Sequence, residues 1–150
     1  MLGDKSRAWL VHVFTASGAA AGLLALERAI AKDFAGMYGW LALALAIDGV
    51  DGTLARRFKV REHLPHIDGD LLDGVIDYLT YVIVPLTAIW TSGVMPPLLA
   101  LISIVLIAPA SSLYFADQWM KTPDYWFRVF PALWNVLAIY FLVFTLPGSV

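Results

Sequence analysis

The chain has 150 residues, of which 60% are hydrophobic and 15% charged, with a formal net charge of −2 and a mean hydropathy of +0.74. A soluble domain of this size cannot bury so much apolar surface, so the composition predicts a helical membrane protein, and we expect no nucleic-acid partner. The sequence has no cysteine, which excludes disulfides, thiolate metal ligands and a cysteine nucleophile.

Five apolar segments follow one another along the chain, each close to the roughly 20 residues that cross a hydrocarbon core as a helix. The first is longer than the apolar core of a cleaved signal peptide, so we expect it to remain as a span. Turn-forming stretches separate the segments, and no repeat or linker divides them. The sequence predicts one membrane-embedded domain over residues 1–150, an all-α polytopic bundle with spans Trp9–Ile30, Phe34–Phe58, Gly69–Thr91, Met95–Phe115 and Trp126–Leu146.

Basic residues are distributed unevenly between the two ends of these spans. Eight fall on the side of the N-terminus and only two, Arg28 and Lys32, on the other. Cytoplasmic loops of membrane proteins carry the excess of Lys and Arg, so this distribution predicts a cytoplasmic N-terminus. The eight residues are Lys5, Arg7, Arg56, Arg57, Lys59, Arg61, Lys121 and Arg128.

Four aspartates interrupt the second and third spans. Asp48 and Asp51 are three residues apart, and Asp73 and Asp77 are four apart, so each pair occupies one helix face. Both pairs lie about one to two turns from the cytoplasmic end, where the two helices are antiparallel neighbours and can bring them face to face. An ionised carboxylate at the membrane centre costs on the order of 2.5–3.5 kcal/mol, so the cluster requires neutralisation. Oxygen donors at this spacing suit Mg²⁺ or Mn²⁺, and two bridged ions suit phosphoryl transfer.

Glycine and arginine accompany these aspartates. Gly49, Gly52, Gly69 and Gly74 lie on the same helix segments, where glycine is unfavourable unless a backbone or a ligand approaches closely. Ordinary helix packing explains each glycine equally well when it is taken alone. Arg56, about one turn beyond Gly52, offers a forked cation that suits a phosphate group.

Together these residues form a pattern that resembles the signature of the CDP-alcohol phosphotransferase family. The interval Arg57 to Asp68 between its two halves is twelve residues, longer than is usual in the family, and in this it resembles the bacterial phosphatidylcholine synthases. Five spans are fewer than family members usually have, so we expect the domain to be incomplete at its C-terminal side. The pattern reads Asp48-x-x-Asp51-Gly52-x-x-Ala55-Arg56 followed by Gly69-x-x-x-Asp73-x-x-x-Asp77.

The resemblance implies a homodimeric enzyme of the bacterial inner membrane that transfers the phosphatidyl group from CDP-diacylglycerol to choline, giving phosphatidylcholine and CMP. Asp77 would be either a metal ligand or the general base that accepts the choline proton. The residues implied as ligands of two Mn²⁺ or Mg²⁺ ions are Asp48, Asp51, Asp73 and Asp77. The residues implied as lining the nucleotide and phosphate pocket are Gly52, Ala55, Arg56 and Gly69.

Choline is a quaternary ammonium, which proteins bind with aromatic rings or carboxylates. Tyr78 and Tyr81 are the best aromatic candidates because they adjoin Asp77, although a membrane-interface aromatic belt also explains them. Three basic residues are candidates for binding lipid phosphates at the anionic inner surface, and topology alone explains them equally well. They are Arg57, Lys59 and Arg61.

Other polar residues have structural interpretations. Asp68 and Asp70 stand at the start of the third span, where carboxylates suit the positive end of the helix dipole. His12, near the start of the first span, is expected to be a packing residue with its hydrogen bonds satisfied.

Three other functions fit parts of the pattern. A related enzyme that uses glycerol phosphate, inositol phosphate or serine would share the aspartates, but a phosphorylated alcohol should require additional cations. A membrane prenyltransferase also uses acidic helices and Mg²⁺, yet its two motifs lie in separate halves of a larger bundle. A non-catalytic metal-binding or transport module would favour polar groups across the bilayer, whereas the third span has no charge after Asp77.

Overall fold

The computed structural model describes residues 3–117, and this part of the chain is helical nearly throughout. Four of its helical stretches are long and apolar enough to cross a membrane. The all-α membrane bundle is therefore confirmed, whereas the expected fifth span, Lys121 and Arg128 lie outside the described residues. The elements are α1 (Asp4–Ile30), α2 (Phe34–Arg57), α3 (Val60–His63), α4 (Gly69–Tyr78), the π-helix η1 (Leu79–Ile83), α5 (Val84–Ser92) and α6 (Pro97–Ala116).

Aspartates begin two of these helices. The Asp33 carboxylate accepts a hydrogen bond from the backbone N–H of Gly36 at 3.0 Å, which caps α2. The Asp68 carboxylate accepts from the N–H groups of Asp70 and Leu71 at 3.0 and 3.1 Å, which caps α4. The helix-start interpretation of Asp68 is thereby confirmed, and α4 begins at a fixed point four residues before Asp73.

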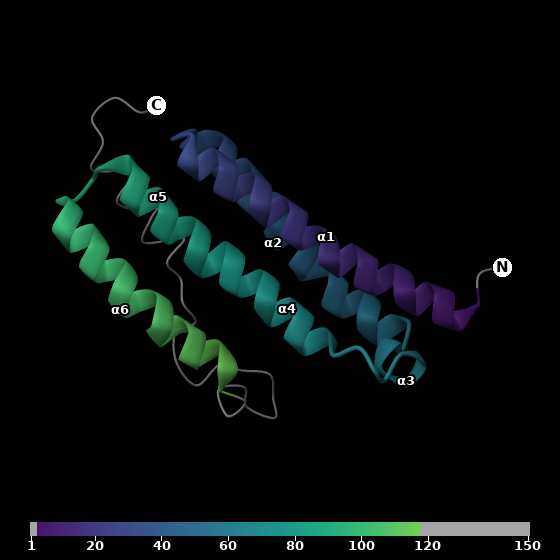
Figure 1. Cartoon of the computed structure of the whole chain (residues 1–150). Helices are drawn as coiled ribbons and strands as arrows, with labels where there is room; N and C mark the ends of the chain where they lie inside the picture. The colour runs from purple at the N-terminus through teal and green to yellow at the C-terminus, as the bar shows by residue number, and fades with distance from the viewer. Residues whose placement is uncertain (1–2, 118–150) are drawn as a thin grey trace.

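Helix α1 packs antiparallel to α2 and parallel to the α4–α5 stretch (Figure 1). Small residues allow this close contact. A Cβ atom on Gly18 would lie 3.2 Å from Ile76 Cγ2, and one on Gly22 would lie 2.7 Å from Leu79 Cδ2. Near the far end, the Thr91 hydroxyl donates to the Ala29 carbonyl at 2.8 Å. Glycine packing of this kind fixes the height of α4 relative to α1.

The predicted third span is a continuous run of α4, η1 and α5 that contains a five-residue π-helix. The sequence pattern did not indicate this wide turn. Its physical cause is Pro85, which lacks an N–H group and whose ring crowds the carbonyl four residues earlier, that of Tyr81. The wider turn relieves this conflict and begins two residues after Asp77.

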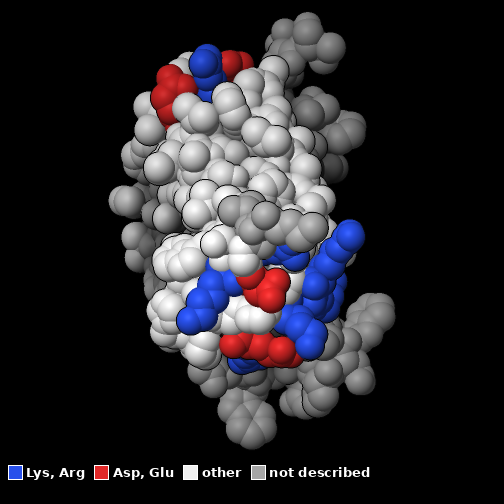
Figure 2. Space-filling view, turned by 90° about the vertical axis from the view of Figure 1, so that its right-hand side faces the viewer, with Lys and Arg blue, Asp and Glu red and all other residues white. Residues whose placement is uncertain are grey.

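Charged side chains gather toward the two ends of the bundle, and the broad band between them is almost free of charge on the face that Figure 2 shows. Helix α6 lies on the opposite side of α4–α5 from α1 and exposes its large apolar side chains, including Leu98, Leu106 and Leu113 (Figure 1). An apolar exterior between charged ends is the surface expected of a bundle that is solvated by lipid.

Candidate metal and phosphate site

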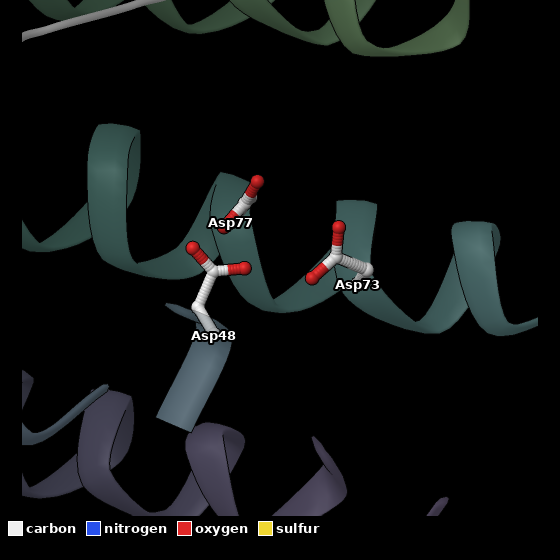
Figure 3. A group of neighbouring side chains, drawn as sticks. All are labelled: Asp48, Asp73 and Asp77. Atoms are coloured by element: carbon white, nitrogen blue, oxygen red, sulfur yellow. The ribbon is translucent and has the colours of Figure 1, made fainter. Parts of the chain in front are cut away.

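Three of the four predicted metal ligands converge. Asp48 of α2 points across to Asp73 and Asp77 of α4, and the three side chains face one another (Figure 3). Their carboxylates each offer an oxygen, and these oxygens lie within 4.8 Å of one another. All three side chains are half-buried. The convergence of these three aspartates is the arrangement that their spacing predicts.

The donor set fits a hard divalent cation. Three carboxylates this close repel one another when ionised, and a cation of charge +2 relieves that repulsion. Mg²⁺ and Mn²⁺ prefer oxygen ligands, and every converging donor here is a carboxylate oxygen. The acidic group can therefore bind a metal ion.

Asp51 has a different environment from the other three aspartates. It is only 8% exposed, and its carboxylate lies beside the Thr15 hydroxyl of α1. A separation of three residues turns Asp51 about 60° around α2 from Asp48, enough to direct it toward α1 instead of α4. The spacing that predicted one shared face did not resolve this difference, and the role of Asp51 as a ligand stays a prediction.

The predicted phosphate-binding residues lie near the end of α2 and at the start of α4. Arg56 is exposed, and its Nη2 donates to the Thr53 hydroxyl at 3.3 Å. Its Nη1 lies 3.5 Å from where a Cβ on Gly52 would stand, so the guanidinium covers the backbone at Gly52. Ala55 packs against the apolar cluster near the start of α1. Gly69 opens α4 beside His12, whose Cε1 is 3.5 Å from the Cβ position of Gly69.

Two of the four glycines that accompany the aspartates do not serve helix packing among the described residues. A Cβ placed on Gly49 or Gly74 would meet no atom within 4 Å, in contrast to Gly18 and Gly22. Each glycine directly follows a converging aspartate, Asp48 or Asp73. Space beside the carboxylates favours the second interpretation of these glycines, the close approach of a ligand.

The two candidate tyrosines differ in their contacts. The Tyr78 hydroxyl donates to the Ala108 carbonyl of α6 at 2.9 Å, and its ring meets Phe115 edge-on with centroids 5.9 Å apart. Tyr78 therefore joins α4 to α6. Tyr81 is half-buried, and the charges of Asp77, Asp48 and Asp73 all act on it. Tyr81 is consequently the better of the two candidates for the acidic site, and its role stays a prediction.

Basic side chains gather where α1 begins and α2 ends, around a surface pocket of about 380 Å³. Two of the three candidates for lipid phosphate, Arg57 and Lys59, line it, whereas Arg61 does not. Lys59 also approaches Glu62 at 3.4 Å in an exposed ion pair. The full lining is Asp4, Arg7, Arg57, Phe58, Lys59 and His63.

Sequence reasoning missed two polar residues of α1 that lie close to the site. Thr15 lies beside Asp51, and His12, one turn earlier, is buried, with no hydrogen-bond partner for its Nε2 within residues 3–117. Within this part of the chain, the expectation that the hydrogen bonds of His12 are satisfied is not met. The signal available was that both residues lie on the small-residue face of α1, which also carries Gly18 and Gly22.

Comparisons with known proteins show that the similarity extends beyond the aspartate motif to nearly the whole chain. The chain is 48% identical over 95% of its length to the phosphatidylcholine synthase of Bradyrhizobium diazoefficiens, of which it covers 54%. It is 46% identical to that of Pseudomonas aeruginosa and 41% identical to that of Agrobacterium fabrum, again over 95% of this chain, covering 60% and 58% of those proteins.

The chain spans little more than half the length of these curated relatives. No family model matches it, and no solved structure matches it. The resemblance predicted from the aspartate motif is nevertheless confirmed: over nearly its whole length, the chain is similar to bacterial phosphatidylcholine synthases.

Proposed function

We propose that this chain forms the catalytic region of a membrane enzyme that transfers the phosphatidyl group from CDP-diacylglycerol to choline. The observation that carries the proposal is the convergence of Asp48, Asp73 and Asp77 across two helices, within a sequence similar to phosphatidylcholine synthases. The choline oxygen forms a new bond to the phosphatidyl phosphorus, the bond from that phosphorus to the bridging oxygen breaks, and CMP leaves.

The four aspartates have different roles in this proposal. Asp48, Asp51 and Asp73 hold two divalent ions, Mn²⁺ or Mg²⁺, and Asp77 is either a further ligand or the base that accepts the choline proton. When bound, such ions polarise the diphosphate and compensate the charge that develops on departing CMP. Asp51 needs only to rotate away from Thr15 to join the other carboxylates, because it lies one turn from Asp48 on the same helix.

The remaining motif residues bind the nucleotide and phosphate. Arg56 exchanges its weak contact with the Thr53 hydroxyl for a charge-assisted hydrogen bond to a phosphate oxygen. Gly52, Ala55 and Gly69 line the pocket for the cytidine part of the donor. The absence of a Cβ at Gly69 leaves the backbone at the start of α4 open to a ligand, and the backbone at Gly52 becomes open when the Arg56 guanidinium moves to a phosphate.

Tyr81 supplies the aromatic face for choline in this proposal. Its proximity to the three carboxylates supports the assignment, because a trimethylammonium group gains from both the ring and the negative charge. Tyr78, also a candidate from sequence, has its hydroxyl hydrogen-bonded to α6 and is the weaker of the two.

The same proposal places the enzyme as a multi-pass homodimer in the bacterial inner membrane with its site and N-terminus on the cytoplasmic side. The basic residues around the pocket at the ends of α1 and α2 support this orientation. Arg57, Lys59 and Arg61 are positioned at that end to contact lipid phosphates.

The acceptor and the donor are tested by product analysis. Membranes that contain the chain, in a host that makes no phosphatidylcholine, are incubated with labelled CDP-diacylglycerol and Mn²⁺ plus choline, glycerol phosphate, inositol phosphate or serine. We expect labelled phosphatidylcholine with choline only. A product with another alcohol identifies a different acceptor, and product from a prenyl diphosphate but not from CDP-diacylglycerol contradicts the proposal.

A further inference from the structure

His12 of α1 is a buried polar residue with an unused hydrogen-bonding atom. Its side chain is 7% exposed, and its Nε2 has no hydrogen-bond partner among the described residues. A buried imidazole nitrogen without a partner costs on the order of 1–3 kcal/mol. A cost of this kind is understandable where the atom is reserved for a ligand.

The helix register places His12 beside the acidic site and on its cytoplasmic side. Along the parallel α1–α4 contact, Gly18 faces Ile76, the neighbour of Asp77, whereas His12 faces Gly69 at the first residue of α4. Gly69 precedes Asp73 by four residues, which corresponds to about 6 Å along the helix axis. His12 therefore lies about one turn nearer the cytoplasm than Asp73 and about two turns nearer than Asp77.

The position of His12 along the bundle determines which part of the substrate it can contact. With the diphosphate held at the aspartates, the acyl chains extend into the membrane and the cytidine extends toward the cytoplasm. Choline offers a single hydrogen-bonding group, its hydroxyl, which must be at the reacting phosphorus. The polar group expected one turn on the cytoplasmic side is the nucleoside.

We propose that His12 Nε2 forms a hydrogen bond with the cytidine part of CDP-diacylglycerol, beside the glycine that begins α4. The inference rests on the proposed function and extends it to a residue outside the aspartate motif. Gly69, which has no side chain, leaves the nucleoside room to reach the imidazole; a methyl group there would stand 3.5 Å from His12 Cε1 and occupy that approach.

Substitution of His12 by glutamine or by asparagine distinguishes a hydrogen bond made by Nε2 from one made by Nδ1. Glutamine extends a polar atom to about the position of Nε2, whereas asparagine reaches about as far as Nδ1. The purified full chain and its His12→Gln, His12→Asn and His12→Ala variants are titrated in detergent with CDP in the presence of Mn²⁺, with thermal stability as the readout. Inorganic pyrophosphate is the control ligand, because it carries the diphosphate without the nucleoside. Circular dichroism checks that each variant is folded.

We expect His12→Asn and His12→Ala to weaken CDP binding by about 5- to 10-fold, the effect of one lost hydrogen bond. His12→Gln should stay within about 2-fold of the unmodified chain, and pyrophosphate binding should be the same in all four proteins. Equal CDP binding by the Gln and Asn variants, or equal losses for CDP and pyrophosphate, would overturn the inference. An unmodified chain that binds neither ligand contradicts the proposed function as well, which distinguishes the two failures.

Discussion

Asp48 of α2 and Asp77 of α4, on two different helices, present carboxylate oxygens within 4.8 Å of each other. Together with Asp73 they concentrate negative charge at one point of an apolar bundle. This relationship predicts that the substitution Asp48→Asn changes the thermal stability of the chain in opposite directions with and without a bound metal ion.

In chelator, Asp48→Asn should stabilise the folded chain, because it removes like-charge repulsion within the acidic group. A gain of about 1 kcal/mol corresponds to a rise in Tm of about 2–4 °C. With excess Mn²⁺ the unmodified chain should have the higher Tm, because it is stabilised by the bound ion and the variant lacks one ligand. Calorimetry or thermal denaturation in detergent measures both values. The same Tm difference with and without Mn²⁺ would show that the carboxylates do not bind the ion.

Gly22→Val should destabilise the bundle by about 1–3 kcal/mol, because the added side chain enters the packed contact between α1 and the π-helix. The Cβ alone would lie 2.7 Å from Leu79 Cδ2 and 3.1 Å from Thr80 Cγ2. The matched control is Gly39→Val in α2, where a Cβ meets no atom within 4 Å. Thermal denaturation compares the two, and equal effects would show that α1 and the π-helix are not packed as described.

Tyr81→Leu should raise the KM for choline by about 5- to 30-fold, because it removes the ring that we place against the trimethylammonium group, while the KM for CDP-diacylglycerol changes little. Tyr81→Trp should retain choline binding, since it keeps an aromatic face. Tyr78→Phe, the control, removes the hydrogen bond to Ala108 and should lower stability without changing the choline KM. A choline effect at Tyr78 and none at Tyr81 would reverse our assignment.

Arg56→Lys should lower kcat/KM by about 10-fold or more, because lysine keeps the charge but not the forked geometry that binds phosphate. The folded state should be nearly unaffected, as Arg56 is exposed and donates only to the Thr53 hydroxyl. Arg57→Lys is the neighbouring control, since Arg57 lines the separate surface pocket at the helix ends. Equal losses for the two variants would contradict a specific phosphate contact at Arg56, and no loss in either would indicate that the charge alone is sufficient.

Much of the fold and of the acidic site was predictable from sequence because both depend on periodic signals. The lengths of the apolar runs predict the four helical stretches, and the three- and four-residue spacings predict that Asp48 meets Asp73 and Asp77. These predictions use helix geometry alone and require no knowledge of side-chain contacts.

Features that depend on neighbouring helices could not be predicted in the same way. The direction of Asp51 toward Thr15 depends on a rotation of about 60° around α2, which matters only once the position of α1 is known. The different contacts of Tyr78 and Tyr81 depend on the approach of α6 and on the π-helix before Pro85. His12 reads as an ordinary packing residue until the register of α1 against Gly69 is fixed.

Choline-dependent release of CMP from CDP-diacylglycerol, measured with and without Mn²⁺ for the unmodified chain and for Asp73→Asn, tests the central claim most directly. We expect release that requires both choline and the metal, and a loss of about 100-fold or more in the variant, which keeps the shape of the side chain but not its charge. Release that is unchanged by Asp73→Asn, or that continues undiminished in a chelator, would contradict the account.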